Sequence, residues 1–233
     1  MPVKRTQSQR TRKAARTSLK KRTATDAFGV GKGFALSSDH RILTKTSSVV
    51  MRYSDSVTLN PGLSGLPASV VLRANGMFDP DAGIGGHQPK GFDQLMAMYE
   101  HYHVDECLLE VWADAQDLTT SQLITLSVNR SPSPIVTRND VLENRMASTY
   151  ALAASQGGPA ATYQRISVNP DKFLGMKSKD DSTWGSDAAN PFQQVYFHAS
   201  AMPIREVDAG EVYLTFKLTY KCTLREPKSV ISS

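Results

Sequence analysis

The chain has 233 residues, 40% hydrophobic and 21% charged, with a formal net charge of +5. This suits one large globular domain with a real core, and no run of about 18 apolar residues exists that could form a membrane-spanning helix. The two cysteines, Cys107 and Cys222, are too few for a disulfide framework or a zinc finger, so we predict packed, reduced thiols.

The first 25 residues form a strongly basic segment with no acidic residue before Asp26. It holds nine of the 27 lysines and arginines, which leaves 18 basic against 22 acidic residues in the rest of the chain. The segment contains too few apolar side chains to offset the loss of chain entropy on folding, so we expect it to be a disordered arm. Its cations predict binding to phosphates without base preference. They are Lys4, Arg5, Arg10, Arg12, Lys13, Arg16, Lys20, Lys21 and Arg22.

The basic arm has two further expected properties. The cluster Lys20–Arg22 also suits a nuclear-import signal, which would bind a host import receptor. The arm lacks the apolar stretch of a secretory signal, so we do not expect export by that route. A glycine-rich hinge, FGVGKGF, follows at 28–34. We therefore divide the chain into an arm with its hinge at 1–35 and a body at 36–233.

The sequence of the body predicts mainly strands. In EVYLTFKLTYKCTL (211–224) apolar and polar residues alternate, and a period of two predicts a long strand with one buried face. The predicted buried residues are Val212, Leu214, Phe216, Leu218, Tyr220, Cys222 and Leu224. Seven further strands are predicted at 47–59, 68–78, 103–115, 122–129, 148–154, 162–168 and 193–201, and in the last of them Val195, Phe197 and Ala199 face one way.

Two short helices interrupt the strand pattern. GFDQLMAMYEHY (91–102) has apolar residues at helical spacing, and RNDVLENRM (138–146) predicts a second helix with Asn139 as its N-cap. Eight strands with few helices predict an all-β fold that closes or forms two sheets. The pattern alone leaves sandwich, barrel and jelly roll open.

The stretch DPDAGIGGHQPKGFDQ, from Asp79 to Gln94, is the strongest candidate for a site. A phosphate-binding P-loop is not predicted, because Lys90 is followed by glycine instead of a hydroxyl residue. Asp79 and Asp81 flank Pro80 and could offer oxygens to a structural calcium, although Asp-Pro is also a common turn. No G-x-S-x-G elbow or other catalytic pattern is present, so we predict no enzyme.

The same region carries a resemblance to a known family. LRANGMFDPDAGIGGHQPKGFDQLMAMYEHYHV (72–104) resembles a strand, loop and helix of the capsid proteins of small, circular, Rep-encoding single-stranded DNA viruses, the circovirus-like viruses. TYQRISVNPDKFLGM (162–176) resembles a second segment of that family, with NPDKFLG in the place of a strand and turn. The resemblance implies an eight-stranded antiparallel jelly roll, a two-sheet β-sandwich with one or two short helices in its loops.

The resemblance also carries functional expectations. It implies a homo-oligomer of about 60 copies that closes into an icosahedral virion, with the arms directed onto a single-stranded DNA genome and assembly in the host nucleus. We expect no cofactor, with a structural calcium at Asp79 and Asp81 left open. Gly83, Gly85 and Gly86 would allow backbone shapes closed to other residues. The loop would shape a subunit contact through Asp79, Pro80, Gly86, His87, Pro89 and Gly91.

Two other classes of protein compete with this reading. A cellular β-barrel that binds nucleic acid and has a basic tail would stack bases on exposed aromatic residues. Phe216 and Tyr220 fall on the predicted buried face, which disfavours that class. A carbohydrate-binding sandwich or enzyme would leave the basic arm unexplained.

Overall fold

The computed structural model describes residues 43–62, 65–83, 85–155 and 161–229. The predicted arm, its hinge and the boundary at 35/36 lie outside these residues. Within the described part of the chain, no helix is long and apolar enough to cross a membrane. The elements are β1 (Thr46–Leu59), β2 (Ala68–Arg73), α2 (Phe92–Met96), β3 (Tyr99–Ala115), β4 (Gln122–Asn129), α3 (Arg138–Leu142), β5 (Ala147–Leu152), β6 (Ala161–Val168), α4 (Pro170–Leu174), η3 (Asp181–Thr183), β7 (Trp184–Gly185), β8 (Tyr196–Pro203) and β9 (Val212–Pro227).

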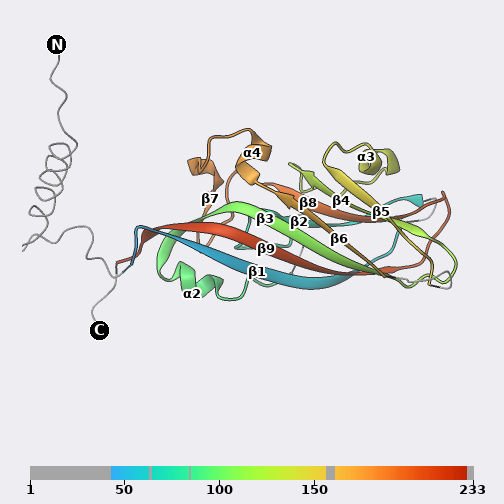
Figure 1. The fold of residues 1–233 in the computed structure, drawn as a ribbon, viewed down its shortest axis with the longest axis horizontal. Coiled ribbons are helices and arrows are strands. Elements are labelled where there is room, and N and C mark those ends of the chain that lie inside the picture. Colours follow the sequence, from blue (N-terminus) through green and yellow to red (C-terminus); the bar gives the residue numbers. More distant parts are fainter. Residues whose placement is uncertain (1–42, 63–64, 84, 156–160, 230–233) are drawn as a thin grey trace, which may run out of the picture. The chain divides into compact units, whose positions relative to one another are not determined.

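Four antiparallel pairings fold the chain back on itself like one long hairpin. β1 pairs with β9, β2 with β8, β3 with β6, and β4 with β5. Two further pairings, β9 with β3 and β8 with β4, roll this hairpin into two sheets, β1-β9-β3-β6 and β2-β8-β4-β5 (Figure 1). This order is the jelly roll, so the predicted all-β fold is confirmed. β7 is an additional two-residue strand beside β3.

The core lies between the inner faces of the two sheets. All seven residues predicted to face inward on the last strand are buried, from Val212 to Leu224, as the alternation predicted. Both cysteines are free and buried. Burial raises the pKa of the Cys107 thiol well above its usual range and that of Cys222 to about 12. Both are packed thiols, as predicted.

Strand β8 departs from simple alternation, because all eight of its residues are buried. Phe197 and Ala199 face the core as predicted, but the opposite face is also covered. The segment 130–146, which contains α3, supplies contacts there: the His198 ring Nε2 lies 2.9 Å from the Ser131 carbonyl, and Arg138 Nη1 donates to the Pro203 carbonyl at 2.6 Å. Figure 1 shows α3 beside β4 and β5.

Both predicted helices are present but shorter than the sequence pattern suggested. α2 ends at Met96 instead of 102, because Tyr99 and Tyr102 are buried residues of β3, which begins three residues after the helix. α3 ends at Leu142 instead of 146. Its N-cap is Thr137 and not Asn139: the Thr137 hydroxyl accepts from the Asp140 backbone N–H at 3.2 Å.

The segment NPDKFLG forms helix α4, so the expected strand and turn at this place were wrong. Asn169 caps the helix by accepting from the Lys172 N–H at 2.9 Å, and Pro170 occupies the first turn. Gly175 ends the helix in the left-handed region, at φ 70°. The asparagine cap, the early proline and the terminal glycine together are a complete helix signal in the sequence.

Candidate functional site

The loop that leaves β2 immediately turns back along the same strand. The Arg73 N–H donates to the Pro80 carbonyl at 2.7 Å, and the Ala82 N–H donates to the Val71 carbonyl at 3.0 Å. Leu72 and Asp81 form an isolated β-bridge. This return segment takes the place of a continuing strand, which is why β2 ends at Arg73 and not at 78 as predicted.

The Arg73 side chain holds the return segment in position. Its Nη1 donates to the Asp79 carboxylate at 2.7 Å, to the Asp79 carbonyl at 2.8 Å and to the Asp81 carbonyl. Its Nε donates to Gln194 Oε1 at 3.0 Å, just before β8 begins. Charge-assisted bonds of this kind are roughly twice as strong as neutral ones, so the guanidinium ties the loop to two strands.

A buried tyrosine fixes the first part of the loop. The Tyr102 hydroxyl accepts from the Met77 and Phe78 N–H groups at 3.1 and 3.3 Å and donates to Asn190 Oδ1 at 3.2 Å. Burial raises the pKa of Tyr102 far above its usual range, so the group stays a hydroxyl. A Cβ on Gly185 would lie 2.4 Å from the Tyr102 ring, which explains the glycine there.

The second part of the loop takes its shape from glycines with positive φ. Gly85, Gly86 and Gly91 have φ of 111°, 102° and 87°, as the prediction for Gly85 and Gly86 requires. The same prediction for Gly83 was wrong, because its φ is not in this region. After Gly86, the His87 ring packs edge-on against Tyr53 with centroids 4.7 Å apart, and the Pro89 carbonyl accepts from the Phe92 N–H at the start of α2.

The two aspartates proposed as calcium ligands already have partners in the chain. Asp79 pairs with Arg73, and Asp81 Oδ1 accepts from the Gly83 N–H at 2.8 Å. Within the described ranges, no group of three or more His, Cys, Asp or Glu residues is arranged to hold a metal ion. Calcium binding in an assembly stays a prediction. In the isolated chain, the loop has the contacts of a structural element.

A second polar cluster, at the base of β3, was not predicted. Both ring nitrogens of buried His103 face carboxylates, with Nδ1 at 3.2 Å from Asp105 and Nε2 at 3.1 Å from Asp171. Asp105 also accepts from the Thr223 hydroxyl at 2.6 Å, and Asp171 accepts from the Lys179 N–H at 2.8 Å. The cluster therefore anchors α4 and the following loop to β3 and β9. Its members lie up to 120 positions apart, so no sequence spacing reveals them.

One end of the sandwich gathers three loops around Asp117. The Asp117 carboxylate accepts from the Gly210 N–H at 2.8 Å, and its carbonyl accepts from the Ser155 N–H at 2.8 Å. The bond from Gly210, followed by that from Thr119, lowers the Asp117 pKa to about 2. Near Asp117, the same end of the sandwich exposes four large apolar side chains from the connections β1–β2, β3–β4 and β8–β9. They are Leu66, Leu118, Ile204 and Val207.

The nine basic residues predicted to bind nucleic acid, from Lys4 to Arg22, lie outside the described residues. Of the predicted loop residues, the structure places Asp79 and Pro80 against Arg73, with Asp79 also beside Asn190. It places His87 on Tyr53, and Pro89 and Gly91 at the start of α2. The motif NGMFDPD (75–81) was the local sequence signal for this network. Its partners Tyr102 and Asn190 could not be found from that motif.

Comparisons with known proteins concern the fold. No family model matches the chain, and no curated protein matches it. Among solved structures, the 60-mer BFDV capsid protein matches at 10% identity with a TM-score of 0.49, covering 82% of this chain and all of that one. The decameric BFDV capsid protein matches at 11% identity with a TM-score of 0.47, covering 78% and 99%. Turnip yellow mosaic virus matches at 12% identity with a TM-score of 0.42, covering 80% and 98%.

Proposed function

We propose that the chain is a viral capsid protein whose body self-assembles into a small icosahedral shell and whose basic arm packages a single-stranded nucleic acid, most simply DNA. The observation that carries this proposal is the strand order. A jelly roll is one of the folds from which viral shells are built, and here it follows a segment with nine cations and no anion.

The features of the described body suit self-association. The loops around Asp117 expose four large apolar side chains at one end of the sandwich, where a monomer gains nothing from them. The Asp117 bonds hold the loops that carry Leu118, Ile204 and Val207 in place, so these apolar groups belong to a prepared surface. A closed shell repeats such a contact by symmetry.

The arm suits the packaging of a polyanion. With about 60 copies, nine cations each would supply about 540 positive charges, the scale of a genome of roughly kilobase length. Binding would be to phosphates, with counterion release and a steep dependence on salt. The body without the arm is mildly acidic, with 18 basic against 22 acidic residues, so its net charge is small. Electrostatic repulsion between neighbouring bodies in a shell is therefore limited. The proposal places the protein in the virion and adds passage through the host nucleus, for which the cluster Lys20–Arg22 would serve as the import signal.

The test is sedimentation and negative-stain imaging of the full-length protein and of a variant lacking residues 2–25. We expect uniform particles about 20 nm across from both. The particles without the arm should carry far less nuclease-protected nucleic acid than the full-length ones, because the arm supplies most of the phosphate contacts. A chain that stays a monomer or dimer at every salt concentration and pH would contradict the shell. Equal amounts of protected nucleic acid with and without the arm would contradict the packaging role of the arm.

The cellular nucleic-acid-binding barrel is the remaining alternative. Phe216 and Tyr220 are buried in the core and cannot stack bases, but the chain exposes other aromatic side chains, so burial of these two does not decide between the classes. The chain forms two separate sheets where such a barrel would close, with edge strands β1 and β6 on one and β2 and β5 on the other. This topology favours the shell protein.

A further inference from the structure

The outward face of the sheet β1-β9-β3-β6 has a composition that the capsid body does not itself explain. Register places its side chains in five rows, four of which cross all four strands. The central three rows are Arg52–Thr219–Leu108–Ser167, Ser54–Lys217–Glu110–Arg165 and Ser56–Thr215–Trp112–Tyr163. Val50, Lys221 and Glu106 precede them, and Thr58, Tyr213, Asp114 and Ala161 follow them. We call this set the open face.

Three large aromatic side chains stand exposed at one end of the open face. Trp112, Tyr163 and Tyr213 have 42%, 45% and 42% of their surface accessible. The Trp112 and Tyr163 rings are neighbours, with centroids 5.2 Å apart and planes tilted by 42°. Exposed aromatic rings held by a rigid sheet are the platforms on which proteins stack the bases of single strands, because every base has a π-face.

Cations and hydroxyls lie directly beside these rings. The Lys217 ammonium lies 5.5 Å from the Trp112 ring centroid and is paired with Glu110 at 2.6 Å. Arg52 and Arg165 are exposed, and neither has an ion-pair partner among the residues that the structure describes. Two guanidinium groups without carboxylate partners, on strands that flank the aromatic rows, are complementary to a phosphate backbone.

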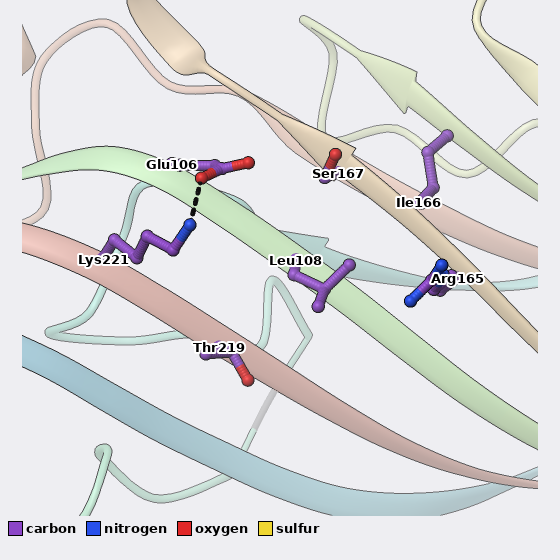
Figure 2. A pocket seen from close by; sticks show the side chains of 7 residues that line it. All are labelled: Glu106, Leu108, Arg165, Ile166, Ser167, Thr219 and Lys221. Carbon is purple, nitrogen blue, oxygen red and sulfur yellow. Dashed lines mark hydrogen bonds and ion pairs between the residues drawn. The ribbon is translucent and has the colours of Figure 1, made fainter.

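A hollow on the same face gives the phosphate contacts a place. It is lined by Glu106, Leu108, Arg165, Ile166, Ser167, Thr219 and Lys221, and Figure 2 shows the Lys221 ammonium bonded across to Glu106. Arg165, Ser167 and Thr219 bring a guanidinium and two hydroxyls to it. Tyr163 lies two residues along β6 from Arg165, about 7 Å away and on the same face of the strand. The carboxylates of Glu106, Glu110 and Asp114 reduce the net charge of the face, so stacking must contribute alongside charge.

We propose that the open face is a binding site for single-stranded nucleic acid, with bases stacked on Trp112 and Tyr163 and the backbone held by Arg165 and Arg52. This rests on the proposed packaging function and adds to it a contact in the body that engages bases, where the arm engages phosphates only. The site has no sequence-specific hydrogen-bond pattern, so it would accept many sequences and prefer single strands over duplex.

The two tryptophans of the chain, Trp112 and Trp184, allow a direct optical test. Trp184 packs on Arg225, 3.9 Å away, and lies outside the five rows. In full-length Trp184→Phe protein, Trp112 is the only tryptophan, and adding an oligothymidylate about 20 nucleotides long should quench its fluorescence. The converse variant, Trp112→Phe, reports on Trp184 and should show little quenching.

Affinity measurements by fluorescence anisotropy provide the second arm of the test. The full-length double variant Trp112→Ala/Tyr163→Ala should bind the labelled oligothymidylate about 5- to 100-fold more weakly than the unmodified chain. The matched control is Phe192→Ala, which removes an aromatic ring that is 85% exposed but lies off the open face, and should leave affinity unchanged. The optical test does not depend on these variants folding.

The outcomes separate this inference from the packaging function. If the unmodified chain binds the oligonucleotide but Trp112 is not quenched, the open-face site is overturned and packaging by the arm stands. If the full-length chain does not bind at all, packaging itself fails. If Trp112 changes its fluorescence equally on assembly without nucleic acid, the face is a contact between copies of the chain, and the proposal is overturned.

Discussion

The two sheets of this jelly roll share an inner core, but their outer faces differ in kind. The outer face of β1-β9-β3-β6 is open and carries Trp112, Tyr163 and cations. The outer face of β2-β8-β4-β5 carries small hydroxyl residues in one register row, with Ser69 bonded to Ser200 and Thr125 to Thr149 at 2.8 and 2.9 Å. Part of this second face is covered by the segment 130–146 of the same chain.

The difference shows how one fold separates two tasks. A sheet that its own chain covers is committed to stability, since its outward residues have become a second layer of buried contacts. A sheet left open can carry large side chains that cost little to expose and are free to bind. We expect substitutions on the covered face to change stability and substitutions on the open face to change binding.

The largest effect should follow from placing a charge under α3. Val141 is 1% exposed, so Val141→Asp would bury a carboxylate without a partner and should lower the free energy of unfolding by about 3 kcal/mol or more. The neighbouring Leu142 is 43% exposed, and Leu142→Asp should cost less than about 1 kcal/mol. Urea unfolding of both variants measures the contrast. Equal effects would mean that α3 does not cover the sheet.

A smaller effect should distinguish outward residues on the two sheets. Met202 points outward on β8 but is fully buried, and Met202→Ala should cost about 2–4 kcal/mol through lost contacts and a cavity. Val50 points outward on β1, with 56% of its surface exposed, and Val50→Ala should cost less than about 0.5 kcal/mol. Thermal unfolding would report both. A costly Val50→Ala would show that the open face is also packed.

The smallest effect should be a pH dependence on the covered face. Burial lowers the pKa of His198 below its usual 6.5, a shift only partly opposed by the bond to the Ser131 carbonyl. The unfolded chain then binds the proton more readily, so this contribution to stability is complete above about pH 6.5 and is lost as the pH falls below it. In denaturant titrations from pH 7.5 down to about 5, His198→Gln should show a flatter decline than the unmodified chain. Identical slopes would exclude His198 as the source.

The fold was predictable where the pattern of adjacent residues in the sequence determines which side chains are buried. The alternation of β9 identified a buried face because the other side of the strand stays open to solvent over residues 213–221. The same reasoning on β8 found only the inward residues, since the cover from 130–146 is a tertiary contact that no period of two records. Likewise, the helical spacing at 91–102 was real, but burying Tyr99 and Tyr102 in the core as part of β3 stabilises the fold more than extending the helix would.

The site was predictable in part. The positive φ angles of the glycines at 85 and 86 are local properties, and both were identified. The expected turn around Pro80 is instead a segment paired with β2. The Arg73 clamp, the Tyr102 network and the His103 cluster join residues from distant strands, so their partners appear only once the sheets are assembled. The open face was missed although Trp112 and Tyr163 belong to strands that were identified. Only the register between β3 and β6 sets these two residues side by side.

The pairing of β1 with β9 has a mechanical consequence. Thr46, where β1 begins, is the register partner of Arg225, near the end of β9. Tension applied between the two ends of the body therefore loads one terminal pair of residues, and the ladder would open pair by pair like a zipper instead of shearing as a whole. Since β1 is an edge strand, a pull on the segment that precedes it would peel this strand away first and leave the β9–β3 pairing intact.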